Sequence, residues 1–150
     1  MAADVRFRVR RHVAVSPQRL WEELIDWESH GRWIPATRVE PGDGDPSRAG
    51  STFTAWTGRG PLTLEDRMRV ERCEWDERAA SGACEVEKLG PVLRGRAGFA
   101  VVSADGGAVV DWFEDVRVPW VPGVLARPVA WVSAAGFRLA IRRLSKLLAT

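Results

Sequence analysis

Three ionisable side chains, Arg11, Asp66 and Glu114, stand where the alternation of their segments places apolar residues. Their apolar neighbours on the same faces are Val9 and Val13, then Leu62, Leu64, Met68 and Val70, then Val110, Trp112, Val116 and Val118. A lone buried charge costs several kcal/mol. Each of the three side chains therefore needs a partner, a ligand or a water-filled cavity.

Two interpretations of this group follow. In the first, Arg11 and Glu114 form a structural ion pair and a β-bulge turns Asp66 outward. In the second, the group lines a hydrated pocket and fixes the polar end of an otherwise apolar ligand. If the site carries out an acid–base step, a desolvated Glu114 or Asp66 with a raised pKa is the candidate proton carrier. Arg11 would then polarise a carbonyl or hold an enolate oxygen.

The other residues that carry chemistry are too few to define a reaction. His12 lies on the outward face of the first predicted strand and His30 in a short helix, which offers neither a zinc site nor a catalytic triad. Cys84 shares an inner face with an apolar neighbour and is interpreted as a small core residue. The sequence therefore predicts no metal and no cofactor.

The composition indicates one globular domain over residues 1–150. Hydrophobic residues make up 45% of the chain and charged residues 28%, so a sizeable core is expected. The net charge of +2 is too small to argue for nucleic acid. We find no signal peptide and no uninterrupted apolar run of about 18 residues, so we expect no integral membrane segment. Two cysteines without a disulfide framework favour the cytoplasm.

Residues 121–150 have the pattern of one long amphipathic helix, which must cover a surface built by the rest of the chain. Its apolar side carries Val129, Ser133, Phe137, Ala140, Ile141, Leu144, Leu147 and Leu148. The middle of that side is built from the small residues Ser133, Gly136 and Ala140. Two interpretations stay open, close packing of the backbone or a void beneath the helix.

Most of the preceding chain alternates like antiparallel strands separated by turns. Strands are predicted at residues 4–15, 51–58, 61–72, 79–88, 92–103 and 108–118, with a short piece near Arg38. Ser16 and Pro17 predict the start of a short helix, and residues 27–34 predict a second one that Pro35 stops. The predicted fold class is α+β, with about seven antiparallel strands, two short helices after the first strand and a long C-terminal helix.

This order of elements, together with several short motifs, resembles the START-like, or SRPBCC, helix-grip superfamily, and within it the bacterial polyketide cyclase/dehydrase and lipid-transport branch. The motifs are Val13-Ala14-Val15-Ser16-Pro17, Leu20-Trp21, Leu24-Ile25-Asp26-Trp27, Trp33-Ile34-Pro35, Gly50-Ser51-Thr52-Phe53 and Gly106-Gly107-Ala108-Val109-Val110-Asp111-Trp112. The resemblance implies a curved sheet that grips the long helix around a cavity. It also implies that the first and last strands are neighbours, which would let Arg11 meet Glu114.

The expected pocket walls converge from the sheet, the second short helix and the long helix. They are Trp33, Ile34, Phe53, Met68, Phe99, Trp112, Val129, Ser133, Gly136 and Phe137. Each of them alone is an ordinary packing residue. Their convergence is what predicts a binding site.

We expect the domain to bind a small hydrophobic molecule, lipid-like or similar to an aromatic polyketide. The second hypothesis is a cyclase or dehydratase type of enzyme that uses Arg11, Asp66 and Glu114. The third is a protein-interaction module with a collapsed interior. Trp131, on the polar side of the long helix, marks a candidate partner surface, homodimer contact or membrane edge, unless a kink at Pro128 returns it to the interior.

Overall fold

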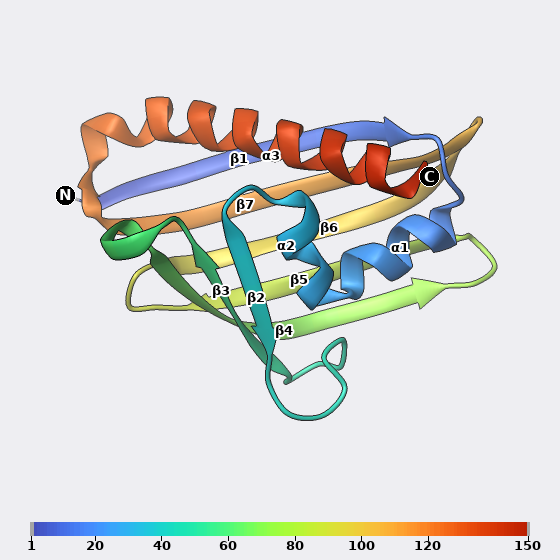
Figure 1. Ribbon diagram of the computed structural model, residues 1–150, viewed down its shortest axis with the longest axis horizontal. Coiled ribbons are helices and arrows are strands. Elements are labelled where there is room, and N and C mark those ends of the chain that lie inside the picture. Colours follow the sequence, from blue (N-terminus) through green and yellow to red (C-terminus); the bar gives the residue numbers. More distant parts are fainter. Residues whose placement is uncertain (1, 150) are drawn as a thin grey trace.

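The computed structural model describes residues 2–149, which form a curved seven-stranded antiparallel sheet, a long C-terminal helix and short helices after the first strand (Figure 1). The strands are β1 (Ala2–Val13), β2 (Thr37–Pro41), β3 (Thr52–Thr57), β4 (Leu64–Asp76), β5 (Ser81–Leu89), β6 (Arg94–Ala104) and β7 (Gly107–Pro122). The helices are α1 (Pro17–Ile25), α2 (His30–Trp33) and α3 (Ala126–Leu148), with the short turns η1 (Trp27–Ser29), η2 (Gly60–Leu62) and η3 (Gly123–Leu125). The predicted α+β helix-grip fold is confirmed. Only Met1 and Thr150 lie outside the described residues.

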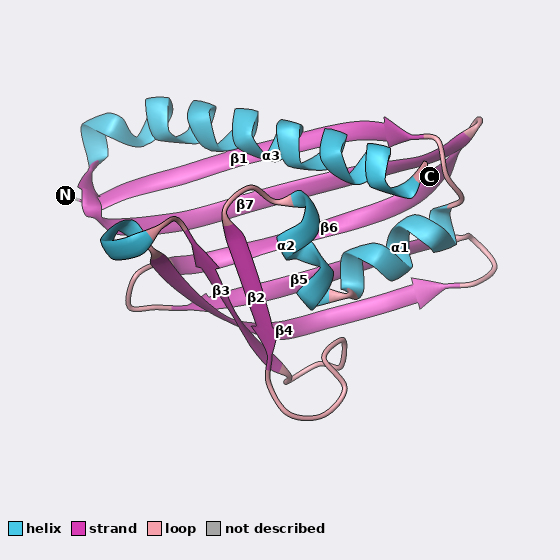
Figure 2. Ribbon diagram, in the orientation of Figure 1, coloured by secondary structure: helices cyan, strands magenta, loops and turns pink. Residues whose placement is uncertain are grey.

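The strands lie in the order β1-β7-β6-β5-β4-β3-β2, so the first and last strands are neighbours. α3 packs along β1, and α1 packs over β5, β6 and β7 (Figure 2). The sheet curves around these helices. Its inner face is therefore the one that carries the core and any enclosed site.

The edge strand β1 shows how alternation separates the two faces of the sheet. Val5, Val9 and Val13 are buried, whereas Arg6 and Arg8 lie on the outer face. These two arginines form ion pairs with aspartates of β7 at 3.1 and 3.0 Å. Exposed pairs of this kind contribute about 0.2–1 kcal/mol each, so burial of the valine row is the larger stabilising effect.

Local sequence signals define the helices that follow β1. The hydroxyl oxygen of Ser16 accepts a hydrogen bond from the backbone N–H of Arg19 at 3.2 Å, and Pro17 occupies the first helical position. The buried side of α1 carries Leu20 and Trp21. The second helical stretch ends before Pro35, as predicted.

α3 begins at Ala126, later than the predicted start at Val121, because β7 continues to Pro122 and η3 turns the chain. The buried residues of α3 are Ala134, Ala140, Ile141, Leu144 and Leu148. Val129, Ser133, Phe137 and Leu147 are partly buried. The predicted stripe is therefore confirmed, with Ala134 added to it.

By length and composition alone, the 26-residue segment Gly123–Leu148 contains an 18-residue stretch apolar enough to cross a membrane, with a mean hydropathy of 1.3 over that stretch. Arg127 and Arg138 interrupt this stretch, so it is not an uninterrupted apolar run, and the absence of an integral membrane segment stays a prediction. In the structure the segment packs its apolar side along β1, and core helices of globular domains pass the same test. Trp131 and Leu139 are exposed on its other side, as predicted for Trp131, and the homodimer stays a prediction.

Two leucines of α3 allow a matched test of this packing. Leu144 is fully buried and Leu139 is 49% exposed. We expect Leu144→Ala to lower the free energy of unfolding by about 2–5 kcal/mol, because a cavity is left in the core. Leu139→Ala should change it by less than about 0.5 kcal/mol. Urea unfolding followed by circular dichroism measures both values, and equal losses would contradict the described orientation of α3.

Candidate ligand-binding site

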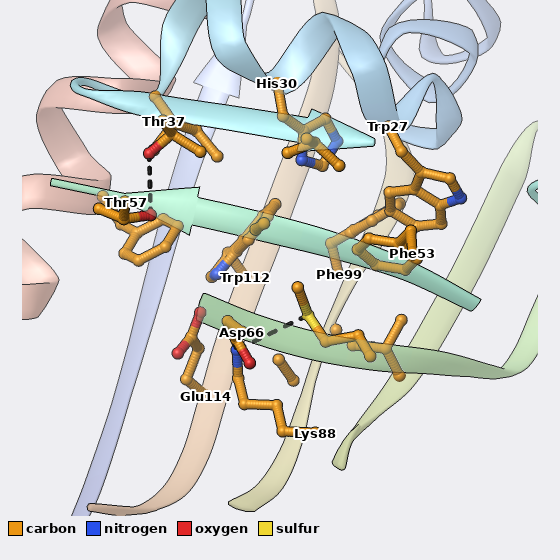
Figure 3. Close-up of a pocket in the computed structure, with 18 residues that line it drawn as sticks. Trp27, His30, Thr37, Phe53, Thr57, Asp66, Lys88, Phe99, Trp112 and Glu114 are labelled. Carbon is orange, nitrogen blue, oxygen red and sulfur yellow. Dashed lines mark hydrogen bonds and ion pairs between the residues drawn. The ribbon is translucent and has the colours of Figure 1, made fainter. Parts of the chain in front are cut away.

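Three adjoining cavities lie between the sheet and the helices. The inner cavity has a volume of about 90 Å³ and is lined by η1, α2, α3 and strands β2 to β7 (Figure 3). The outer cavity, about 340 Å³, is bounded by Ile34, Pro35 and Gly136. The end cavity, about 240 Å³, lies between β1, β7 and the first half of α3. Glu114 and Phe137 line all three, so the cavities meet at these two side chains.

Aromatic rings form much of the wall of the inner cavity. Trp27 stacks on Phe53 with ring centroids 4.4 Å apart. Trp112 stacks on Phe99 at 5.6 Å and on Phe137 at 5.0 Å. The strand register places Phe99 and Trp112 side by side on β6 and β7. A wall of this kind favours apolar groups, and planar ones in particular.

An ammonium group interrupts this apolar surface. The Lys88 side chain is 4% exposed, and its Nζ donates a hydrogen bond to Asp66 Oδ2. Nζ also lies 3.7 Å from Met68 Sδ. Burial disfavours the charged form, but the negative charges of Glu114 and Asp66 outweigh that effect and raise the pKa of Lys88. Lys88 is therefore a cation at neutral pH rather than a nucleophilic amine.

Glu114 completes the charged group from β7. Burial raises the pKa of this carboxyl, the Lys88 ammonium opposes that rise, and the charge of Asp66 adds to it. The indole N–H of Trp112 lies toward Glu114 and lowers its pKa (Figure 3), although Trp112 Nε1 is not aligned to form a hydrogen bond within residues 2–149. The neutral acid form of Glu114 is thus more favoured than in a solvated glutamate.

Small residues of β6 let the charged group span the sheet. Lys88 on β5 pairs with Gly95, and Glu114 on β7 pairs with Ala97. Gly95 has a φ of 137°, and a Cβ there would clash with the carbonyl oxygen of Asp115. No bulky side chain of β6 therefore separates the ammonium of Lys88 from Glu114.

Arg11 does not belong to this group, which corrects the prediction that it meets Glu114. In the register of β1 and β7, Arg11 pairs with Val110 and Glu114 pairs with Phe7. Four residues along a strand correspond to about 13 Å. Because β1 is an edge strand, the Arg11 side chain can reach solvent, and it is exposed. Lys88 supplies the cation that Arg11 was expected to supply.

Asp66 faces the inner cavity, so the hypothesis of a bulge that turns it outward is wrong. The register of β3 and β4 is regular through Asp66, and the irregularity of β4 comes later, between Val70 and Arg72. Asp66 Oδ1 is buried and has no hydrogen-bond partner within residues 2–149. This orphaned oxygen points to an interaction that the protein alone does not complete.

Most of the predicted wall residues come together. Those that line the inner cavity are Ile34, Phe53, Met68, Phe99, Trp112 and Phe137. Ser133 lines the outer and end cavities, Gly136 the outer cavity and Val129 the end cavity. Trp33 lines none of the three, since it is fully buried and packs edge-on against Trp112 with centroids 6.0 Å apart. At Gly136 a Cβ would meet nothing within 4 Å, so open space, and not close packing, adjoins this part of α3.

Sequence reasoning missed three important members of the site. Lys88 continues the inner row of Cys84 and Val86 by one alternate position, so the signal was present at the end of the predicted strand. Trp27 and His30 also line the inner cavity. They are the first residues of η1 and α2, which are too short for strand or helix periodicity to define a face.

His30 is a structural residue of the cavity wall. Its Nε2 donates to the carbonyl oxygen of Leu24 at 2.7 Å, and burial lowers its pKa to about 4 despite that bond. His30 is therefore neutral at pH 7, with Nδ1 unprotonated. Residues 2–149 contain no cluster of three or more His, Cys, Asp or Glu side chains that would hold a metal.

A curved antiparallel sheet that encloses cavities beneath a C-terminal helix defines the START-like helix-grip class of proteins. The chain belongs to the polyketide cyclase / dehydrase and lipid transport family, whose model matches residues 4–149. No curated protein sequence matches the chain. Family and fold together suggest a role in hydrophobic ligand binding or lipid transport.

Solved structures with the same fold are distant in sequence. A Rhodobacter sphaeroides protein aligns with a TM-score of 0.71 and 20% identity over 97% of this chain and 92% of its own. The STAR-related lipid transfer protein from Xanthomonas axonopodis gives 0.71 and 14% over 97% and 86%. Ara h 8.0201 gives 0.57 and 17% over 95% and 99%. At these identities the similarity shows the fold alone.

The lowered pKa of His30 predicts a loss of stability in acid. Folding favours the neutral imidazole, so the contribution of His30 is complete above pH 6.5 and is lost as the pH falls toward about 4. The total corresponds to about 3 kcal/mol. We expect His30→Gln to be less stable than the wild type at pH 7.5 and to lose less stability between pH 6.5 and 4. Urea unfolding across this range measures the difference, and parallel curves would contradict a buried neutral His30.

Proposed function

We propose that this protein binds a small, largely hydrophobic molecule, lipid-like or similar to an aromatic polyketide, between the sheet and α3. The observation that carries the proposal is a cavity with aromatic walls that contains the incompletely paired group of Lys88, Asp66 and Glu114. An apolar core gains nothing from such a group, because burying these charges costs more than packing aliphatic side chains of similar volume. A ligand with an apolar body and a polar end would use both parts of the site.

The geometry supports entry through the outer cavity. That cavity shares Asp66, Lys88, Glu114 and Phe137 with the inner one. Its rim carries Gly136, where no side chain narrows the opening. An apolar body would lie against the aromatic wall, with the polar end at the charged group.

A change that fills the inner cavity tests this proposal. Ala97 lines that cavity, whereas Ala100 lies on the opposite face of the same strand. We expect native mass spectrometry of wild-type protein purified from its own host, followed by denaturing extraction, to reveal a bound molecule. Ala97→Leu should lose it and Ala100→Leu should retain it, with similar melting temperatures for the two variants.

The opposite result would favour the protein-interaction module. In that case all three proteins would be empty, and naphthalene, a simple apolar probe, would not raise their melting temperatures. Retention of the molecule by Ala97→Leu would place the ligand elsewhere.

The raised pKa of Glu114 favours a second candidate function, an enzyme of the cyclase or dehydratase type. A carboxyl whose neutral form is favoured by burial and which faces an apolar cavity is suited to donate a proton to a carbonyl or hydroxyl oxygen. Glu114→Gln keeps the size and shape of the side chain and removes the acidic proton of the carboxyl group. For an enzyme we expect this variant to lose turnover of the extracted molecule by at least about 100-fold while binding it within about threefold. Loss of binding without loss of turnover per bound molecule would contradict the acid role.

A further inference from the structure

The charges around the three cavities are almost balanced. Lys88 is the one cationic side chain among the lining residues, because His30 is neutral. It is already paired with Asp66. The remaining ionisable group is the carboxyl of Glu114, for which burial favours the neutral form. The site is therefore close to neutral, or negative by one charge when Glu114 ionises.

Because the charges of the site are balanced, a charged head group on the ligand would have no free opposite charge to pair with. A carboxylate or phosphate on the ligand would lie beside Asp66 and Glu114, and the one ammonium that would attract it is engaged. An amine would lie beside the Lys88 ammonium in a poorly solvated space, and the charge that would offset this repulsion is an ionised Glu114, which burial disfavours. Like charges in such surroundings repel strongly, so either head group would have to be neutralised or held away from the inner cavity.

The unpaired polar atoms describe what the site does accept. Within residues 2–149, Trp112 Nε1 is a buried donor that lies toward Glu114 without an aligned hydrogen bond, and Asp66 Oδ1 is a buried acceptor without a hydrogen-bond donor. Both side chains line the inner cavity (Figure 3). An uncharged group that both donates and accepts hydrogen bonds, such as a hydroxyl, can engage each of them without adding charge.

We infer that the site selects hydrophobic molecules with an uncharged hydroxyl-bearing head, such as phenols and long-chain or polycyclic alcohols, over free carboxylic acids and amines. This inference rests on the proposed function and narrows its ligand class. The ion pair of Lys88 and Asp66 then has a definite role. It holds Asp66 Oδ1 as an oriented acceptor while cancelling its charge.

Four probes with one bicyclic body test the selectivity. They are naphthalene, 2-naphthol, 2-naphthoate and 2-naphthylmethylammonium. At pH 7, isothermal titration should give 2-naphthol an affinity at least about tenfold higher than each of the other three, one well-made polar interaction being worth about this factor. Naphthalene measures the contribution of the apolar walls, because it has no head group.

Two variants separate the charge from the hydrogen bonds. Asp66→Asn releases Lys88 from its counter-ion, so 2-naphthoate should gain at least about tenfold while naphthalene changes by less than about threefold. Glu65→Gln is the control, because it removes the same charge from the exposed neighbouring position of β4. It should change neither the affinity for 2-naphthoate nor the affinity for naphthalene. Trp112→Phe removes the N–H donor and keeps an aromatic ring. It should reduce the advantage of 2-naphthol over naphthalene to below about threefold.

The possible results are distinct. If 2-naphthoate or 2-naphthylmethylammonium binds the wild type as tightly as 2-naphthol, or if 2-naphthol binds no better than naphthalene, the inference is wrong although the proposed function stands. If none of the four probes binds, the proposed function fails and the inference fails with it. If Glu65→Gln changes 2-naphthoate binding as much as Asp66→Asn does, overall charge sets the preference and the inference is again wrong.

Discussion

The buried ammonium of Lys88 determines which side chains must surround it in the candidate site. A cation in this position needs negative charge nearby, and the chain provides it from β4 on one side and β7 on the other. β4 lies next to β5 in the sheet, but β7 does not, because β6 lies between β5 and β7. Lys88 can approach Glu114 across β6 because the β6 residues paired with them, Gly95 and Ala97, have no large side chain. The position of Lys88 thus explains the carboxylates on β4 and β7 and the small residues on β6.

The helix α3 divides into two parts with different roles. Its second half buries Ala140, Ile141, Leu144 and Leu148 against the core. Its first half is more exposed, and there Ser133 and Gly136 border the outer cavity, while Val129 borders the end cavity. The stabilising contacts are therefore concentrated away from the open end of the site. A domain arranged in this way can keep an internal cavity, because the second half of α3 holds the helix on the core.

The fold could be predicted from sequence because each signal was local and repeated. Alternation in the strands, the cap at Ser16 and the stripe of the last helix all agree with the structure. The charged site was only partly predictable. Alternation placed Asp66 and Glu114 on the inner face correctly, but it cannot distinguish an edge strand from a central one, so it also placed Arg11 inside. Strand ends are equally ambiguous, which is why Lys88 was missed. The partners of a buried charge depend on how strands are paired in the sheet. The sequence of one strand alone does not determine its pairing register with a distant strand.

The aromatic wall has an optical consequence. The chain contains eight tryptophans and no tyrosine, and Trp27, Trp33 and Trp112 gather around His30 within 6.1 Å between ring centroids. Of these indoles, those of Trp27 and Trp112 line the inner cavity. An occupant that replaces water near Trp112, or that stacks against its ring, alters the polarity sensed by that indole. The site thus carries its own fluorescent reporter, and occupancy can be followed without attaching a label.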